Sequence, residues 1–438
     1  MKKKKLLLVF VVSLISCASL AQKSAKHLSL QEAIAASISN NDAIKLSALD
    51  VQIASAKFRQ TDAIFLPQAN FSYSALTTNN PLNAFGFKLQ QKSITEADFQ
   101  PKLLNKPSAT PDFSAKFELQ QPLLNMDMLY QRKAAIVQVE MYQLLSERTK
   151  EYLCFETEKA YLQLQMVYDE NKVLNEALAT AKAVYKTSKD YYDQGLIPKS
   201  DLLNAELQVM NIETQVKSSQ SGIQDASDML SILMDKSTGT VYTTDPISIT
   251  NAVITDSAAS SNERSDFKAL QKGMESYDMM IKSSKMSWLP RLNAFASWQL
   301  NDKSLFGSNA NAYFAGIQLS WNIFNGNRTR NTVSQQQLEK EKIAKQLDQQ
   351  KSEAQLQINH ARRQLADAIF FMKQQQLAVE QASEALRVLQ NRYTQGLVKT
   401  TDVLMAQTQL SQQKIGYVHA VFNYNLAAAS LQFLTTSK

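Results

Sequence analysis

Residues able to do acid–base or metal chemistry are few in this chain of 438 residues. Its three histidines, His27, His360 and His419, lie far apart, and none stands at a metal-ligand spacing from another. The sequence has no glycine loop of the phosphate-binding type and no nucleophile elbow. We therefore expect no enzymatic activity, no catalytic residue, no metal site and no cofactor.

Two aspartates stand out by position, because Asp201 and Asp402 each follow a Gly-Leu pair at the same distance. An acidic side chain in the first turn of a helix commonly compensates the helix dipole, and this is one interpretation of both residues. Gly195 and Gly396, which precede them, are typical of the residues that end helices. The alternative is a functional role for the carboxylates, which depends on what surrounds them.

The N-terminus has the order of a secretory signal peptide over residues 1–21: lysines at 2–5, an apolar stretch at 6–15, then small residues. We favour cleavage after Ala21. Leu14-Ile15-Ser16-Cys17 also resembles a lipobox, and cleavage there would leave Cys17 acylated at the new N-terminus. If Cys17 is removed, Cys154 is the remaining cysteine, and no intrachain disulfide can form.

Charge and hydropathy exclude two further classes of protein. The formal charge of +7 includes the four signal-peptide lysines, which leaves about +3 for the mature chain, too little to suggest a nucleic-acid partner. After the signal peptide, no window offers the roughly 18 consecutive apolar residues of a transmembrane helix. The sequence thus argues against a helical inner-membrane protein.

The chain contains two copies of one unit, residues 22–236 and 263–438, joined by a linker at 237–262 that we expect at the equator of the molecule. The segment from Tyr192 to Leu196 matches that from Tyr393 to Leu397, and four further identities follow at the same offsets. Two other pairs agree with this repeat: residues 119–125 with 319–325, and residues 65–68 with 288–291.

Periodicity switches twice within each unit. Alternation of apolar and polar residues predicts strands at 64–76, 112–124, 289–300 and 312–324, separated by loops at 77–111 and 301–311. Apolar residues at spacings of three and four, without Gly or Pro, predict long helices at 125–193 and 327–393. Return helices are expected at 199–234 and 400–434, and entry helices at 30–63 and 265–286. The fold class is mainly α, built of long antiparallel helical hairpins with a small β part.

Four strands per chain cannot close on themselves. In a bilayer each unpaired backbone group at an open sheet edge costs several kcal/mol, so strands of other copies must complete the sheet. Two copies would give eight strands, whose interior side chains fill, whereas three would give twelve strands and an open lumen. A conduit therefore predicts a homotrimer with a twelve-stranded transmembrane barrel.

Taken together, the repeat, the turns Gly195-Leu196 and Gly396-Leu397, and the strand-ending motifs resemble the TolC-like outer-membrane efflux family over essentially the whole mature chain. These motifs are Gln121-Pro122-Leu123 and Trp321-Asn322-Ile323-Phe324-Asn325-Gly326. The resemblance implies a homotrimer in the outer membrane with an α-helical tunnel through the periplasm. It also implies an exit duct for small molecules or exported cargo, working with a periplasmic adaptor and an inner-membrane pump in tripartite efflux or type I secretion.

The resemblance also implies roles for particular residues at the helix turns. Asp402 takes the place of an aspartate ring that narrows the periplasmic aperture, where three carboxylates would attract cations and repel one another. Asp201 and Tyr393 match positions that hold neighbouring helices shut. The family's second aspartate is Met405 here, so this constriction is expected to be less acidic. The residues implied to dock the adaptor are Gly195, Leu196, Gly396 and Leu397.

A periplasmic coiled-coil adaptor or scaffold is the alternative function, because helical hairpins dominate the sequence. An adaptor should have one hairpin flanked by glycine-rich β domains. This chain has two hairpins divided by alternating strand pairs, which favours the channel.

Overall fold

The structure is a computed structural model that describes residues 26–249 and 264–435. The signal peptide, both interpretations of its cleavage at Ala21 or Cys17, and the second half of the expected linker lie outside these residues. The chain divides into two compact units that cut across both repeats. Residues 50–143 and 269–347 form one, here called the sheet unit; the remaining described residues form the other, the hairpin unit.

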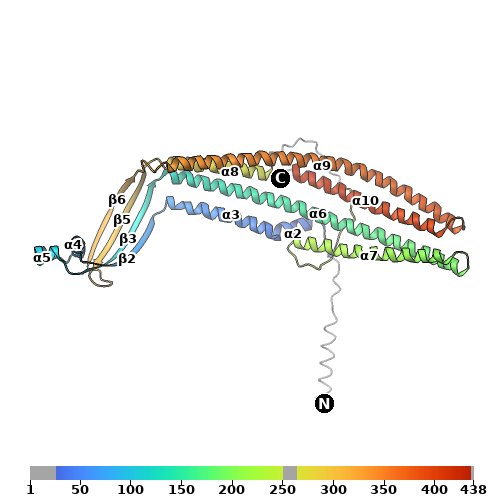
Figure 1. The fold of residues 1–438 in the computed structure, drawn as a ribbon, viewed down its shortest axis with the longest axis horizontal. Helices are drawn as coiled ribbons and strands as arrows, with labels where there is room; N and C mark the ends of the chain where they lie inside the picture. Colours follow the sequence, from blue (N-terminus) through green and yellow to red (C-terminus); the bar gives the residue numbers. More distant parts are fainter. Residues whose placement is uncertain (1–25, 250–263, 436–438) are drawn as a thin grey trace, which may run out of the picture. The chain divides into compact units, whose positions relative to one another are not determined.

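The sheet unit contains one antiparallel sheet in the order β2-β3-β5-β6, and Figure 1 shows the four strands side by side. Their bounds are β2 Gln68–Thr78, β3 Thr110–Leu124, β5 Arg291–Asp302 and β6 Ala310–Ser320. The last strand was expected at 312–324, but residues 321–325 do not pair. Among the described residues, β2 pairs only with β3 and β6 only with β5, so each has one free edge.

The strand register gives the sheet one apolar and one polar face. A single row across the four strands joins Phe71, Phe117, Trp298 and Tyr313, all of them exposed. The adjacent row, on the opposite face, contains Ser72, Lys116, Gln299 and Ala312. An exposed aromatic row of this kind is typical of a surface that lipid or another protein covers.

The connection expected as a loop at 77–111 is partly helical, which corrects the sequence prediction. It contains α4 (Pro81–Gln90), the 3₁₀ turn η2 (Glu96–Phe99) and α5 (Pro101–Asn105). Asn80 caps α4 by accepting hydrogen bonds from the N–H groups of Leu82 and Asn83, and Pro81 occupies the first helical turn, where its missing N–H costs nothing. This cap was visible in the sequence as Asn-Pro.

In place of one entry helix at 30–63, the chain forms α2 (Leu30–Asn40), α3 (Asp42–Gln60) and the 3₁₀ turn η1 (Thr61–Ile64). Asn41 makes the break, with an extended backbone at φ −61° and ψ 135°. Its side-chain oxygen accepts from the Ala43 N–H at 2.8 Å, and its amide nitrogen donates to the Leu233 carbonyl at 2.8 Å. One asparagine therefore ends α2 and caps α3.

The long helices are α6 (Met126–Asp193) and α9 (Arg328–Thr394), with 68 and 67 residues. At about 1.5 Å per residue, each is on the order of 100 Å long. The return helices are α7 (Lys199–Leu233) and α10 (Thr400–Thr435), and α8 spans Ser265–Met286. No helix among the described residues is long and apolar enough to cross a membrane.

The expected linker begins with structure that the sequence analysis missed. Its strand β4 (Tyr242–Thr243) pairs in parallel with β1 (Lys26–His27), and the Tyr242 side chain is buried. The Tyr168 hydroxyl donates to the Tyr242 carbonyl at 2.7 Å. Strands of two residues leave no periodicity that a sequence can display.

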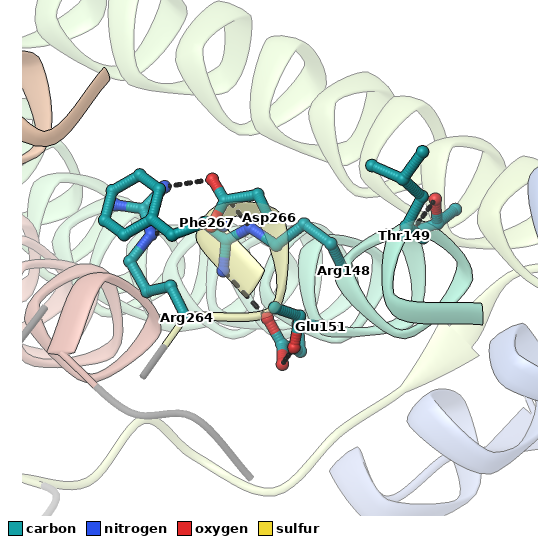
Figure 2. A network of polar contacts seen from close by, with 8 residues as sticks. Arg148, Thr149, Glu151, Arg264, Asp266 and Phe267 are labelled. Carbon is teal, nitrogen blue, oxygen red and sulfur yellow. Dashed lines mark hydrogen bonds and ion pairs between the residues drawn. The ribbon is translucent and has the colours of Figure 1, made fainter. Parts of the chain in front are cut away.

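A polar network holds the first turn of α8 against α6 in the hairpin unit (Figure 2). Arg264 is buried and donates twice to Asp266, at 3.1 and 2.7 Å. Arg148 on α6 ion-pairs with Glu151 at 2.9 Å, and Glu151 in turn accepts from the Ser265 hydroxyl at 2.9 Å. The buried guanidinium is thus paired, as a charge with little access to water requires.

Candidate functional site at the helix turns

Both hairpins of the hairpin unit end in the same backbone turn, at Gly195 between α6 and α7 and at Gly396 between α9 and α10. The glycines are left-handed, with φ of 71° and 74°. In each turn the glycine N–H donates to the tyrosine carbonyl three residues earlier, at 2.9 Å. The following leucine N–H donates to the carbonyl five residues earlier, at 2.8 and 3.0 Å. These bonds satisfy the last carbonyls of α6 and α9 and form a standard C-terminal cap.

The leucines of the two turns, Leu196 and Leu397, are both exposed. A Cβ added to either glycine would meet no atom within 4 Å, so the turns are open as well as tightly bonded. Each hairpin therefore presents one apolar side chain on a rigid turn.

The two aspartates differ in what they bond. The Asp402 carboxylate accepts the backbone N–H of Lys399 at 3.2 Å and so closes the first turn of α10. Asp201 has the same position in α7, but the counterpart of Lys399 is Pro198, which has no N–H to donate. Its one local contact is the Ser200 hydroxyl at 3.5 Å. Helix capping is thus observed for Asp402, whereas the Asp201 carboxylate is weakly engaged.

Tyr393 lies buried, 6% exposed, and joins three helices. Its hydroxyl is 3.3 Å from the Ser188 hydroxyl on α6 and 3.1 Å from the Thr400 hydroxyl on α10. Both partners are buried. Sequence reasoning missed Ser188 because it lies 205 residues from Tyr393, and it missed Thr400, only seven residues away, because no pattern marks a contact across the turn. Its counterpart in the first repeat, Tyr192, is 38% exposed.

Beside the turns the two hairpins pack on one another through an apolar cluster that includes Val184, Leu386 and Leu404. The repeat counterpart of Leu404 is Leu203, which is 51% exposed where Leu404 is 7% exposed. Met405, on the next position of α10, is 72% exposed. The first repeat therefore has an apolar position without the cover that the second repeat receives within the chain.

Ion pairs farther along these helices are exposed and contribute little. Lys414 on α10 lies 2.9 Å from Glu176 on α6, and the Arg387 guanidinium holds the pKa of Glu384 below its ordinary value. Solvent screens exposed pairs of this kind, so their contribution to stability is small. In the part of the chain that the structure describes, no group of three His, Cys, Asp or Glu side chains could hold a metal ion.

The chain matches the model of one protein family. The family model described as outer membrane efflux protein matches residues 33–233 and 258–437, one segment for each repeat. A search of curated proteins gives no match.

Solved structures of channels share the fold. CusC is 16% identical, with a TM-score of 0.79 over 96% of each chain. The CmeC outer membrane channel of Campylobacter jejuni is 15% identical, with a TM-score of 0.73 over 93% of this chain and 85% of that one. The open state of the MtrE outer membrane channel of Neisseria gonorrhoeae is 12% identical, with a TM-score of 0.73 over 93% and 88%.

Proposed function

We propose that this chain, which belongs to the outer membrane efflux protein family and is an exit channel of the outer membrane, works as a homotrimer gated at its helix turns. Family channels form trimers in tripartite efflux systems, and the family is one of transport proteins rather than enzymes. The partners proposed here are a periplasmic adaptor and an inner-membrane pump. Neither the family match nor the similar folds support the adaptor or scaffold alternative.

The free edges of β2 and β6 support the trimer. In lipid, unpaired N–H and C=O groups cost several kcal/mol each, and pairing β6 with β2 of the partner subunit removes both edges. Leu203 is exposed, whereas its counterpart Leu404 is buried within the chain. This difference supports a contact between Leu203 and a partner close to the helix turns.

The repeat also predicts the register between copies. The motifs at 65–68 and 288–291 align β2 with β5 at an offset of 223, and those at 119–125 and 319–325 align β3 with β6 at 200. These offsets convert the pair Gln68↔Gln120 into Arg291↔Ser320, which is the pair observed. Applied to the β3–β5 pair Glu118↔Ser297, they predict Gln318 opposite Ser74 of the partner subunit.

Disulfide cross-linking tests this arrangement. Directly opposed residues on antiparallel strands lie about 4.5–5.5 Å apart, within disulfide range. In a Cys154→Ser background, Gln318→Cys with Ser74→Cys should give covalent dimers and trimers on gels. Gln318→Cys with Asn70→Cys, four residues out of register, is the matched control and should remain monomeric. Cross-linking of the control alone, or of neither pair, would contradict the proposed closure.

For the proposed gate at the helix turns, we assign Asp402 and Asp201 to the ring of side chains that narrows the channel. We assign Tyr393 to the contacts that hold the helices in the closed arrangement, and Met405 to an apolar ring next to the aspartates. The exposure of Met405 and the weakly engaged carboxylate of Asp201 support this assignment. Carboxylates gathered around one axis attract cations.

Single-channel recording in planar bilayers tests the gate. Asp402→Ala and Asp201→Asn should each change conductance or its block by added cations. The matched control is Asp193→Asn, at the last residue of α6. If conductance and cation block are unchanged in both variants, the aspartates have no part in the constriction.

The exposed leucines Leu196 and Leu397 are the proposed adaptor contacts, held in place by Gly195 and Gly396. Leu196→Ser and Leu397→Ser should weaken adaptor pull-down while leaving conductance in bilayers unchanged. Weaker conductance with normal adaptor binding would count against docking at the turns.

A further inference from the structure

A polar cavity of about 690 Å³ lies in the sheet unit, where β5 and β6 meet the ends of α6, α8 and α9. This volume is within the range of small-molecule sites in proteins. Six of the residues that line it carry a hydroxyl group: Ser283, Ser284, Ser287, Ser320, Thr329 and Thr332. Arg291 and Arg328 belong to the same lining.

Charge in the cavity is unbalanced. Arg291 ion-pairs with Asp127, the one carboxylate of the lining. Arg328 has no side-chain hydrogen bond or ion pair with any residue that the structure describes, and neither do the hydroxyls of Ser320 and Thr332. An unpaired guanidinium beside free hydroxyl donors is the donor set that binds phosphate oxygens.

Comparison of the repeats explains why the cavity is open. In the first repeat, Arg132 packs over the Phe58 ring at 4.3 Å and donates to the Thr61 hydroxyl at 3.0 Å. At the offset that aligns the strand-ending motifs, its counterpart is Thr332, which is too short to fill the same space. Ser284, the counterpart of Thr61, donates instead to Gln336 at 2.9 Å.

The cavity adjoins an exposed apolar surface. Leu289 and Trp321 are lining residues and are themselves exposed, as are Ile323 and Phe324 directly after Trp321. The Trp321 indole N–H donates to the Trp288 carbonyl at 2.8 Å, which fixes the ring at this rim. Arginine beside tryptophan and aliphatic side chains is typical of the boundary between membrane and water.

We propose that this cavity binds the phosphate of a phospholipid headgroup, with Arg328 as its ion-pair partner and the acyl chains against Trp321, Ile323 and Phe324. The inference rests on the proposed function to the extent that the sheet lies in the membrane. Free phosphate offers the same headgroup chemistry without the chains, and the experiment separates the two sources.

Native mass spectrometry of the purified, delipidated full-length channel in detergent tests the proposal, with phosphatidylglycerol as the titrated probe. Arg328→Gln should weaken binding about tenfold, the effect of losing a charge-assisted hydrogen bond. Arg330→Gln is the matched control: Arg330 is exposed, lies two residues away and is outside the lining, so binding should stay at the wild-type level.

Thr332→Arg distinguishes binding that needs an open cavity from binding that needs only positive charge. The substitution places the arginine of the first repeat in the cavity and also adds a positive group. It should reduce phosphatidylglycerol binding by filling the cavity. Wild-type binding in both Arg328→Gln and Thr332→Arg would overturn the proposal. So would diacylglycerol binding as tightly as phosphatidylglycerol, or inorganic phosphate binding with no added affinity from acyl chains.

Conductance in planar bilayers, recorded on the same preparations, keeps this test apart from the proposed function. Loss of lipid binding with wild-type conductance in Arg328→Gln is the expected combination. A wild-type protein that binds the lipid but does not conduct would count against the channel mechanism and leave the lipid site standing.

Discussion

The α6–α7 turn and the α9–α10 turn share left-handed glycines and the same hydrogen bonds from the glycine and leucine N–H groups, but differ in the residues that follow. Pro198 leaves the Asp201 carboxylate without a backbone partner among the described residues, whereas the Lys399 N–H donates to Asp402. Tyr393 is buried between helices, and its counterpart Tyr192 is exposed. At these turns the duplicated units therefore keep their backbone geometry and diverge in the contacts of their side chains.

The glycine substitutions should have the largest effect and should be equal in the two turns. Gly195→Val and Gly396→Val each place a branched side chain at a left-handed φ, which costs about 2 kcal/mol of unfolding free energy. Denaturant unfolding in detergent measures this cost. Gly86→Val, in helix α4 with open space around its Cα, is the control and should stay within about 0.5 kcal/mol. Clearly unequal costs at Gly195 and Gly396 would break the backbone equivalence.

The next largest loss of stability is expected from removing the hydroxyl of Tyr393, compared with that of its counterpart Tyr192. Tyr393→Phe leaves the buried hydroxyls of Ser188 and Thr400 without this partner and should cost about 1 kcal/mol. Tyr192→Phe removes an exposed hydroxyl and should change stability by less than about 0.5 kcal/mol. Denaturant unfolding midpoints of the two variants, measured under the same conditions, test this difference. Similar losses of stability would show that burial does not distinguish the two tyrosine hydroxyls.

Exchange of the residues before the aspartates should have a smaller effect on stability. Lys399→Pro removes the N–H that Asp402 accepts and should cost about 0.5–1 kcal/mol, while freeing the carboxylate to increase cation block in bilayers. Pro198→Lys gives Asp201 a donor and should lower the block. If both substitutions moved the block in the same direction, the difference in capping would not explain the difference between the turns.

The smallest effect is expected in the connection between β2 and β3 of the first repeat. In the first repeat, the Lys88 ammonium and the Thr95 backbone N–H lower the pKa of Asp98 to about 2. A depressed pKa means that this stabilisation is complete above the ordinary aspartate range near pH 4 and is lost as the pH falls through about 2. The hydrogen-exchange protection factors of residues 81–99, which are corrected for the intrinsic exchange rate at each pH, should therefore stay high at pH 4 and fall toward pH 2. The Asp98→Asn variant should lack this pH dependence.

Much of the fold could be predicted from local patterns. The two-unit repeat, the long helices and the alternating strands follow from periods of 3.6 and 2 and from the scarcity of Gly and Pro. Helix α4 and the break at Asn41 were missed although Asn-Pro and Asn-Asp are readable caps, because the surrounding residues carry no strong periodicity. The ends of the strands were misplaced by a few residues, since pairing rather than alternation decides where a strand stops.

Neighbouring residues in the sequence are enough to predict the glycine caps at 195 and 396, the aspartates after them and the missing N–H at Pro198. Which of these side chains make contacts depends on the tertiary structure. Tyr393 finds Ser188 across two helices, and Thr332 leaves a cavity where Arg132 fills its counterpart. The physical reason is that backbone conformation is set within a few residues, whereas burial and hydrogen-bond partners come from segments far apart in the chain.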